Sequence, residues 1–411
     1  MRRPPATAGA GRRTLLVLTQ VYIPDPASVG QHMADTAAEM ARRGWRVVVL
    51  TSRDGYDDPS VRYPPRETRQ GVEIIRFRWC SFGKGSIAAR LLGGLSFVLQ
   101  SIGRGVTLGR IDSILVSTAP PMASLAALVV GRLRRAAITW WVMDLNPDQM
   151  VALGKLGPGA LPVRLLDGLN RRILARARRV VALDRFMADR LNIKRDVREK
   201  LTVLPPWPLD DHLEPVPHSA NPFRSAHGLQ GKFVVMYSGN HGPSSPFSTI
   251  LGAAARLTDE PRLVFMFIGG GVGKREVEAV NLPNVRSLPY QPLDQLRYSL
   301  SAADVHLVTM GDDVVGIVHP CKVYGSMAVA RPILLLGPEQ SHVGDLLARA
   351  SFGWILRHGD VEGAARLLRD LIALPQAALD ERGGRGRALV EQDLCKARLC
   401  GQLCDLLEGH A

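Results

Sequence analysis

The segment 316–332 holds the residues best suited to bind a phosphate group. It runs Gly-Ile-Val-His-Pro-Cys-Lys-Val-Tyr-Gly-Ser-Met-Ala-Val-Ala-Arg-Pro. Pro320 suits the first position of a helix, which places Lys322 in the first turn. A cation there opposes the helix dipole, at a cost of about 0.3–1 kcal/mol, unless an anion such as a diphosphate docks at the same helix end. We therefore interpret Lys322 as a diphosphate ligand, and the alternative is a lysine that extends into solvent. His319 would add a hydrogen-bond donor or cap the helix.

Glycine-containing turns follow several apolar runs of strand length. Gly30 lies just before a predicted helix, where free backbone N–H groups can bind an anion. Gly239 and Asn240 belong to Tyr-Ser-Gly-Asn-His-Gly, which lets the backbone turn tightly and approach a ligand. The triple glycine 269–271 gives similar access. Each of these segments could equally be an ordinary turn between a strand and a helix.

Asp144 follows the apolar run 137–143, at the carboxyl end of a predicted strand, where sites form in open α/β sheets. Its alternative role is a cap on the following turn. The chain has no Asp-x-Asp triplet, the usual carboxylate motif for a metal–diphosphate complex. The spacing of the three C-terminal cysteines matches no standard zinc site. We expect no metal and no cofactor.

These candidate residues need elements that bring them together, and apolar runs alternate with amphipathic helical segments along most of the chain. Near-continuous Val/Ile/Leu runs between helices are typical of parallel sheets that are covered on both faces. The strands are predicted over residues 14–22, 46–51, 72–77, 111–117, 137–143, 179–183, 201–204, 233–238, 263–268, 285–288, 305–310 and 332–336.

The alternation breaks at the proline-rich segment 205–231, which marks a domain boundary. The predicted fold class is α/β, with two Rossmann-like domains facing across a cleft and a helix at the C-terminus. The predicted units are a flexible tail 1–13, an N-terminal domain 14–206, a linker 207–231, a C-terminal domain 232–375 and a helical segment 376–411.

The composition is that of a globular protein with an anionic partner. With 46% hydrophobic and 22% charged residues, extended disorder, collagen and coiled coils are excluded. The 52 basic and 38 acidic residues give a net charge of +14. Arginines concentrate over Arg171–Arg179, which we interpret as a surface for anionic lipid or phosphate; a merely solvated face is the alternative. Aromatic residues are not interleaved with these arginines, so no nucleic acid partner is expected.

The sequence predicts a cytoplasmic protein. The apolar stretch between Arg90 and Arg104 is shorter than the roughly 20 residues that a membrane span needs. Five cysteines give no disulfide framework. Peripheral attachment to the inner face of the cytoplasmic membrane is left open.

Taken together, these motifs resemble the GT-B glycosyltransferases of family 4, and among them the enzymes of O-antigen and colanic-acid type polysaccharide assembly. The resemblance rests on the glycine after the first strand, on Tyr-Ser-Gly-Asn after the linker and on Pro-x-Lys-x-Tyr-Gly-x-x-Ala-x-x-Arg-Pro, and it spans about residues 14–408. The segment 144–148 is similar to that group's Asp-x-x-Pro-acidic motif.

The resemblance implies a retaining transfer from a nucleotide-diphosphate sugar to a glycan or lipid-linked acceptor, without a metal. It places the acceptor on the N-terminal domain, where Asp144 is the candidate catalytic residue, and the nucleotide sugar on the C-terminal domain. The donor-binding candidates that it implies are Gly30, Gly239, Asn240, His319, Lys322, Tyr324 and Gly325.

The sequence also departs from the family pattern. Many members have two glutamates eight positions apart in the segment 316–332, the second of which binds the ribose; here Ile317 and Gly325 occupy these positions. Many also have cations just after the second-domain glycine loop and a histidine before the first-domain aspartate, which this chain lacks. Two alternatives therefore stay open: a nucleotide-sugar epimerase of the same fold, and a non-catalytic subunit that binds sugar nucleotides.

Overall fold

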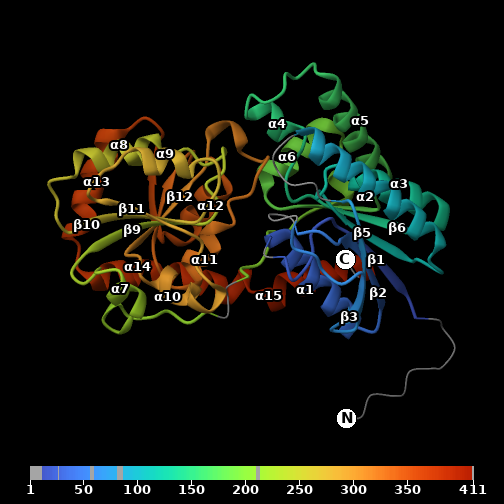
Figure 1. Ribbon diagram of the computed structural model, residues 1–411, viewed down its shortest axis with the longest axis horizontal. Coiled ribbons are helices and arrows are strands. Elements are labelled where there is room, and N and C mark those ends of the chain that lie inside the picture. The colour runs from blue at the N-terminus through green and yellow to red at the C-terminus, as the bar shows by residue number, and fades with distance from the viewer. Residues whose placement is uncertain (1–11, 26, 56–59, 81–86, 210–212, 410–411) are drawn as a thin grey trace, which may run out of the picture.

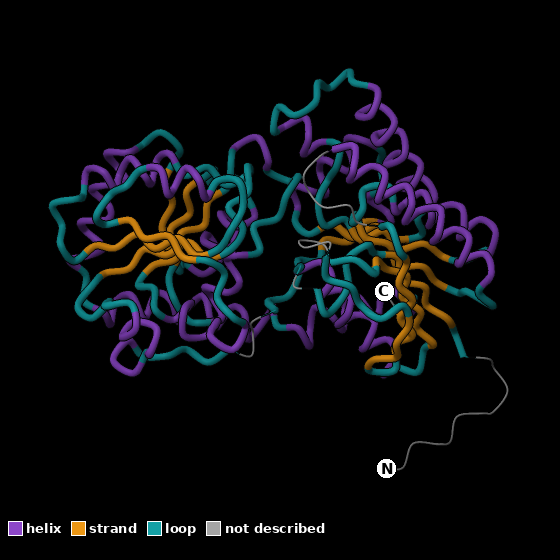
Figure 2. The backbone as a smooth tube through the Cα atoms, in the orientation of Figure 1, coloured by secondary structure: helices purple, strands orange, loops and turns teal. Residues whose placement is uncertain are grey.

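Two parallel sheets, each covered by helices, form the two domains of the chain (Figures 1 and 2). The computed structural model describes residues 12–25, 27–55, 60–80, 87–209 and 213–409, so the predicted tail 1–13 lies almost wholly outside the described residues. The predicted fold class is confirmed, because two parallel-sheet α/β domains and a C-terminal helix are present.

The N-terminal sheet has eight strands in the order β3-β4-β2-β1-β5-β6-β7-β8, parallel except for the edge strand β3. The central strands are buried along their whole length, as their continuous apolar sequences predict. The strands are β1 (Thr14–Leu18), β2 (Arg46–Ser52), β3 (Arg66–Arg69), β4 (Val72–Phe77), β5 (Ser113–Ser117), β6 (Ala137–Trp141), β7 (Arg179–Ala182) and β8 (Leu201–Val203).

Helices cover both faces of this sheet. Helices α2, α3 and α5 lie side by side on one face, and α1 lies on the other (Figure 1). The helices of this domain are α1 (Ser28–Arg42), α2 (Ile87–Thr107), α3 (Ala123–Arg134), α4 (Asp148–Ala152), α5 (Leu161–Arg176) and α6 (Arg185–Lys194), with a 3-10 turn at Arg198–Lys200.

The C-terminal sheet has six parallel strands in the order β11-β10-β9-β12-β13-β14. Its strands are β9 (Phe233–Ser238), β10 (Leu263–Ile268), β11 (Val285–Leu288), β12 (Val305–Thr309), β13 (Ile333–Leu336) and β14 (Gly353–Leu356). Its helices are α7 (Pro222–Ala226), α8 (Ser248–Arg256), α9 (Lys274–Ala279), α10 (Leu296–Ser301), α11 (Lys322–Ala328), α12 (His342–Ala350), α13 (Val361–Ala373) and α14 (Gln376–Leu389), with 3-10 turns at His218–Ala220, Leu293–Gln295 and Asp312–Val314.

The C-terminal helix returns to the N-terminal domain. After α14 and a π turn at Val390–Leu394, helix α15 (Lys396–Glu408) packs against α1 (Figure 1). Arg43, at the end of α1, donates to Asp405 over 2.6 Å and to Glu408 over 2.8 Å. The chain therefore crosses between the domains twice.

Part of the segment predicted as a linker is folded onto the C-terminal domain. Arg224 of α7 is buried and forms an ion pair with Asp304 over 3.2 Å. Its guanidinium also donates to the carbonyl oxygens of Ala302 and Leu229, over 2.6 and 2.7 Å. Such a buried charge is tolerated because its donors are satisfied.

Candidate active site

The loops at the carboxyl ends of the two sheets meet at the domain boundary. The backbone N–H of Leu145, after β6, donates to the carbonyl of Ile317, before α11, over 2.8 Å. Arg190 of α6 donates to the carbonyl of Val315 over 2.6 Å. The segment that holds the predicted phosphate ligands is thus anchored against the N-terminal domain.

Asp144 stands at this boundary. Its backbone N–H and that of Met143 both donate to the hydroxyl of Thr118, over 3.1 and 3.2 Å, which fixes the turn after β6. Asp144 is exposed as a residue, although nearby protein atoms desolvate its carboxyl group. The resulting desolvation raises the pKa of Asp144 to about 6, although the nearby His319 opposes the shift. Burial, and the charge of Asp144, raise the pKa of the Cys321 thiol to about 12, which places Asp144 beside the start of α11.

Lys322 opens α11 and lies along the glycine turn after β9. A Cβ on Gly239, which has φ of +134°, would come within 2.7 Å of Lys322 Cε. The ammonium lies 5.2 Å from the ring centroid of Tyr237, within cation–π range. In the described part of the chain no carboxylate forms a salt bridge with Lys322, so its charge is available to an anion. Because α11 spans only seven residues, the positive charge here comes mainly from the lysine.

Asn240 lies in one of two glycine turns that pack closely against each other. A Cβ on Gly269 would lie 2.0 Å from the carbonyl oxygen of Gly239, and a Cβ on Gly271 would lie 2.4 Å from Asn240 Oδ1. The N–H of His241 donates to the carbonyl of Gly270 over 2.7 Å. These glycines are therefore required by the close approach of one turn to the other, whether or not a ligand binds there.

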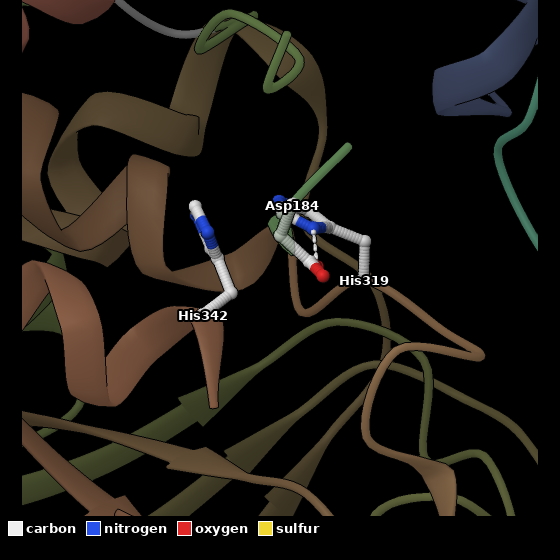
Figure 3. Close-up of side chains that lie close together, drawn as sticks. All are labelled: Asp184, His319 and His342. Atoms are coloured by element: carbon white, nitrogen blue, oxygen red, sulfur yellow. Dashed lines mark hydrogen bonds and ion pairs between the residues drawn. The ribbon is translucent and has the colours of Figure 1, made fainter. Parts of the chain in front are cut away.

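His319 and Tyr324 belong to a chain of hydrogen bonds that crosses the domain boundary. His319 Nδ1 lies 3.0 Å from Asp184 Oδ2 (Figure 3), and His319 Nε2 lies 2.9 Å from the Tyr324 hydroxyl. The same hydroxyl lies 2.9 Å from His342 Nε2. All four groups are satisfied when His342 donates to Tyr324, Tyr324 donates to His319, and His319 donates to Asp184.

The surroundings of these groups favour the protonation states that this direction of donation needs. Burial raises the pKa of Tyr324 well above its ordinary value, and burial together with His319 lowers the pKa of His342 well below its own. Burial alone would raise the pKa of Asp184, but the hydrogen bond from His319 holds it below its usual range. Tyr324 thus stays protonated, His342 neutral and Asp184 ionised.

The same cluster is the place in the described residues where a metal ion could be held. Ligand atoms of Asp184, His319 and His342 all lie within 4.8 Å of one another. The Tyr324 hydroxyl, however, lies at hydrogen-bond distance from Nε2 of both histidines. The contacts therefore fit a hydrogen-bond relay, and an ion would have to displace the tyrosine.

The contacts described for the two remaining predicted residues lie within their own domains. Gly30 is in the first turn of α1, and its described contacts lie within the N-terminal domain: a Cβ there would be 3.1 Å from Cα and N of Tyr22. Gly325 lies in α11, and its carbonyl accepts from the N–H of Val329 over 3.3 Å. The structure thus brings together Asp144, Gly239, Asn240, His319, Lys322 and Tyr324 at the domain boundary.

Sequence reasoning missed three polar residues of this region. Asp184 follows β7 just as Asp144 follows β6, so the same rule about strand ends could have found it. His342 carried no sequence signal, because only folding places it beside α11. Lys274 follows the triple glycine, and its ammonium lies 3.2 and 3.3 Å from the carbonyl oxygens of Gly269 and Leu288.

A cavity of about 390 Å³ lies away from these residues and is lined by Lys232, Phe233 and Asp304, at the amino ends of β9 and β12. The donor loops lie at the opposite, carboxyl edge of that sheet. The candidate site is therefore defined by its charges and loops and not by the size of a cavity.

Comparison with known proteins bears on this arrangement. Residues 28–207 match the family described as a glycosyl transferase 4-like domain. The chain is 26% identical to the probable glycosyltransferase WbjE of Pseudomonas aeruginosa over 390 residues, which cover 92% of this chain and 94% of that protein. It is also 26% identical to the putative colanic acid biosynthesis glycosyl transferase WcaI of Escherichia coli strain K12 over 354 residues, 81% of this chain and 85% of that one.

The fold is shared with solved structures of low sequence identity. The structure of HepE from Anabaena in complex with UDP and glucose superposes with a TM-score of 0.71 at 13% identity, over 96% of this chain and 99% of that one. At this identity the likeness concerns the fold alone.

Proposed function

We propose that the chain, a glycosyltransferase of the GT-B fold whose residues 28–207 match a glycosyl transferase 4-like domain, retains the anomeric configuration of the sugar it transfers. The donor is a nucleotide-diphosphate sugar, and the acceptor is a glycan or a lipid-linked glycan. The observation that carries the proposal is Lys322, a cation without a salt-bridge partner in the described residues, which lies against Gly239 and close to Asp144 of the other domain.

The donor diphosphate would bind where α11 meets the glycine turns. Lys322 supplies the positive charge, and Gly239 and Asn240 let the backbone approach the phosphate oxygens. Charge builds up on the diphosphate as the glycosidic bond breaks, so a fixed cation at this point stabilises the transition state more than the ground state. We propose that this charge makes a metal unnecessary.

The acceptor would enter from the N-terminal domain, beside Asp144. In a front-face transfer the acceptor hydroxyl attacks on the side from which the diphosphate departs, and a departing phosphate oxygen takes its proton. No side-chain nucleophile is needed. An ionised Asp144 would stabilise the positive charge that develops on the sugar ring.

The names of similar proteins support the class of donor and product. WcaI is named for colanic acid biosynthesis, and HepE was solved with UDP and glucose. We therefore propose a role in cell-surface polysaccharide or glycolipid synthesis. Ile317 and Gly325 stand where many family members have glutamates, so the ribose must be bound by other groups.

Isothermal titration with UDP-, GDP- and dTDP-sugars, followed by transfer to lipid-linked acceptors, tests the proposal. We expect micromolar-range binding of one nucleotide class, and an NMR coupling constant of the product that shows retention. Product without an acceptor would favour the epimerase, binding without hydrolysis or transfer would favour a non-catalytic subunit, and inversion would refute the retaining mechanism.

A further inference from the structure

Exposed apolar side chains gather on one face of the N-terminal domain. Nine of the 17 exposed large hydrophobic side chains in the described residues lie on α2, α3 and α5, helices of 21, 12 and 16 residues. They are Leu91, Leu92, Leu95, Leu99 and Val106 on α2, Leu125 and Leu133 on α3, and Leu161 and Leu165 on α5. Apolar surface concentrated in this way marks an interaction site, whereas scattered single residues do not.

On α2 the exposed leucines form a stripe that faces away from the protein. Leu92, Leu95 and Leu99 follow helical spacing, and Leu92 and Leu99 are 62% and 61% exposed. The opposite side of α2 is closely packed: a Cβ on Gly105 would come within 2.7 Å of the Val130 side chain of α3. The helix therefore has one face for the domain and another that the fold leaves uncovered.

The helices that carry these apolar side chains are also rich in arginine. There are two arginines in α2, two in α3 and four in α5, against a single acidic residue, Asp167. Asp167 is already paired with Lys194 over 2.5 Å and with Arg171 over 2.8 Å. Arg164 and Arg172 of α5 are exposed, so the surface carries uncompensated positive charge next to its leucines.

We propose that α2, α3 and α5 dock onto an anionic lipid bilayer. The leucines would enter the boundary between headgroups and acyl chains, and the arginines would contact lipid phosphates. In the part of the chain that the structure describes, no helix has the length and hydrophobicity needed to cross a membrane, so docking would be peripheral.

A bilayer fits this surface better than a second copy of the chain. In a symmetric dimer through these helices the arginines of one copy would face those of the other, which costs free energy without anions between them. Lipid phosphates supply the missing negative charge along the whole surface. The proposal rests on the proposed function only for the identity of the acceptor. Helix α4 leads from Asp144 towards α5 and belongs to the same domain as the docking surface, so a lipid-linked acceptor would reach the site from the bilayer.

Co-sedimentation of the full chain with vesicles tests the proposal. With equal parts of phosphatidylcholine and phosphatidylglycerol we expect binding that weakens with salt and is much weaker for phosphatidylcholine alone. The variant L92S/L95S/L99S should bind at least about tenfold less, because it loses the inserted apolar surface. Its melting temperature should match that of the wild type, since these side chains are exposed. The matched control is L293S/L374S, which removes exposed leucines from the C-terminal domain and should bind as the wild type does.

Three results would overturn the proposal: wild-type chain that stays in the supernatant, a triple variant that binds as well as the wild type, or a control that loses as much binding. Sedimentation equilibrium tests whether a second copy of the chain occupies this surface instead. A wild-type dimer that the triple variant abolishes would assign the surface to a second copy.

Transfer to a water-soluble acceptor separates the membrane proposal from the proposed function. It should be unchanged in the triple variant, whereas failure of the proposed function would remove it from the wild type as well.

Discussion

His319 of the C-terminal domain donates from Nδ1 to Oδ2 of Asp184 in the N-terminal domain over 3.0 Å, with 1% and 4% of the two side chains exposed. The other oxygen of Asp184 accepts from the N–H of Met187 over 2.8 Å and so caps α6. One buried carboxylate thus joins the start of a helix in the first domain to the turn that precedes Lys322 in the second. This bond contributes to the placement of the proposed diphosphate ligand relative to Asp144.

Asp184→Asn should weaken the contact between the domains. The amide oxygen can still cap α6, but the amide nitrogen cannot accept the hydrogen bond from His319. We expect a loss of about 1.5–3 kcal/mol in the free energy of unfolding, the range for hydrogen bonds to charged groups, measured by urea denaturation.

The control for this variant is Asp345→Asn, which breaks a different bond between the domains. Asp345 pairs with Arg185 over 2.7 Å, but the two side chains are 40% and 54% exposed. Exposed pairs contribute at most about 1 kcal/mol. Equal losses in the two variants would contradict a special role for the buried pair.

Lys322→Ala should weaken donor binding. Removal of the Lys322 ammonium from the Gly239 turn takes away the charge that holds the diphosphate, and we expect at least about a tenfold rise in the Kd of the nucleotide sugar, as for a charge-assisted contact of about 1.5 kcal/mol. Titration calorimetry measures it.

Lys274→Ala is the matched comparison for Lys322→Ala. Both lysines lie near His241. Burial lowers the pKa of His241, its backbone hydrogen bonds oppose this shift, and the charges of the two lysines lower the pKa further. Lys274 already lies at hydrogen-bond distance from two carbonyl oxygens. Its loss should reduce stability more than donor affinity, and an unchanged Kd in Lys322→Ala would refute the assignment of Lys322.

Activity should rise with pH through the titration of Asp144. Desolvation raises the pKa of Asp144 to about 6, so the carboxyl is largely neutral below this pH and ionised above it. If the ionised form stabilises the reacting sugar, kcat/KM should fall as the pH drops below about 6, and Asp144→Asn should remove this acid limb along with most activity. The control is Asp148, whose carboxylate pairs with Lys194 over 2.9 Å. The variant Asp148→Asn should keep the fall in kcat/KM at acid pH.

Much of the fold could be predicted from local sequence, because continuous Val/Ile/Leu runs and intervening helices specify a covered parallel sheet by themselves. The same reasoning located Asp144, Gly239 and Lys322, since each follows or opens such an element. The predicted strand over 137–143 ends at Trp141 instead, because Met143 and Asp144 turn away to bond with Thr118.

What the sequence could not supply are partners that only the domain arrangement brings together. Asp184 and His319 are 135 positions apart, and no local pattern links them. Likewise Trp141, at the end of β6, packs on Trp207 from the segment that leaves the N-terminal domain, and both side chains are buried.

Stability should decrease as the pH falls from about 6.5 to 4, in part through His306. Burial lowers the pKa of His306 to about 4, while the unfolded chain titrates near 6.5. In this window the unfolded chain binds a proton that the folded chain does not, so stability is lost as the pH falls. We expect His306 to account for about 2 kcal/mol between pH 7 and pH 5.

His306→Gln isolates this contribution. The glutamine amide can still donate to the carbonyl of Leu300, which now lies 2.9 Å from His306 Nε2, but it does not titrate. Urea denaturation at both pH values should show a shallower pH dependence in the variant. The same slope as in the wild type would mean that other groups carry the effect.

Gly30→Ala separates a packing role of this glycine from a role in donor binding. A Cβ at Gly30 would lie 3.1 Å from Cα and N of Tyr22, and backbone atoms cannot move aside as a side chain can. We expect a loss of about 1–3 kcal/mol in unfolding free energy, typical of overpacking. Gly103→Ala in α2 is the control, because a Cβ there meets nothing within 4 Å and should stabilise the helix by up to about 1 kcal/mol. If Gly30→Ala is destabilised but binds the nucleotide sugar as tightly as the wild type, the residue serves packing alone. If donor affinity also falls at temperatures where the variant is fully folded, the start of α1 takes part in binding the diphosphate.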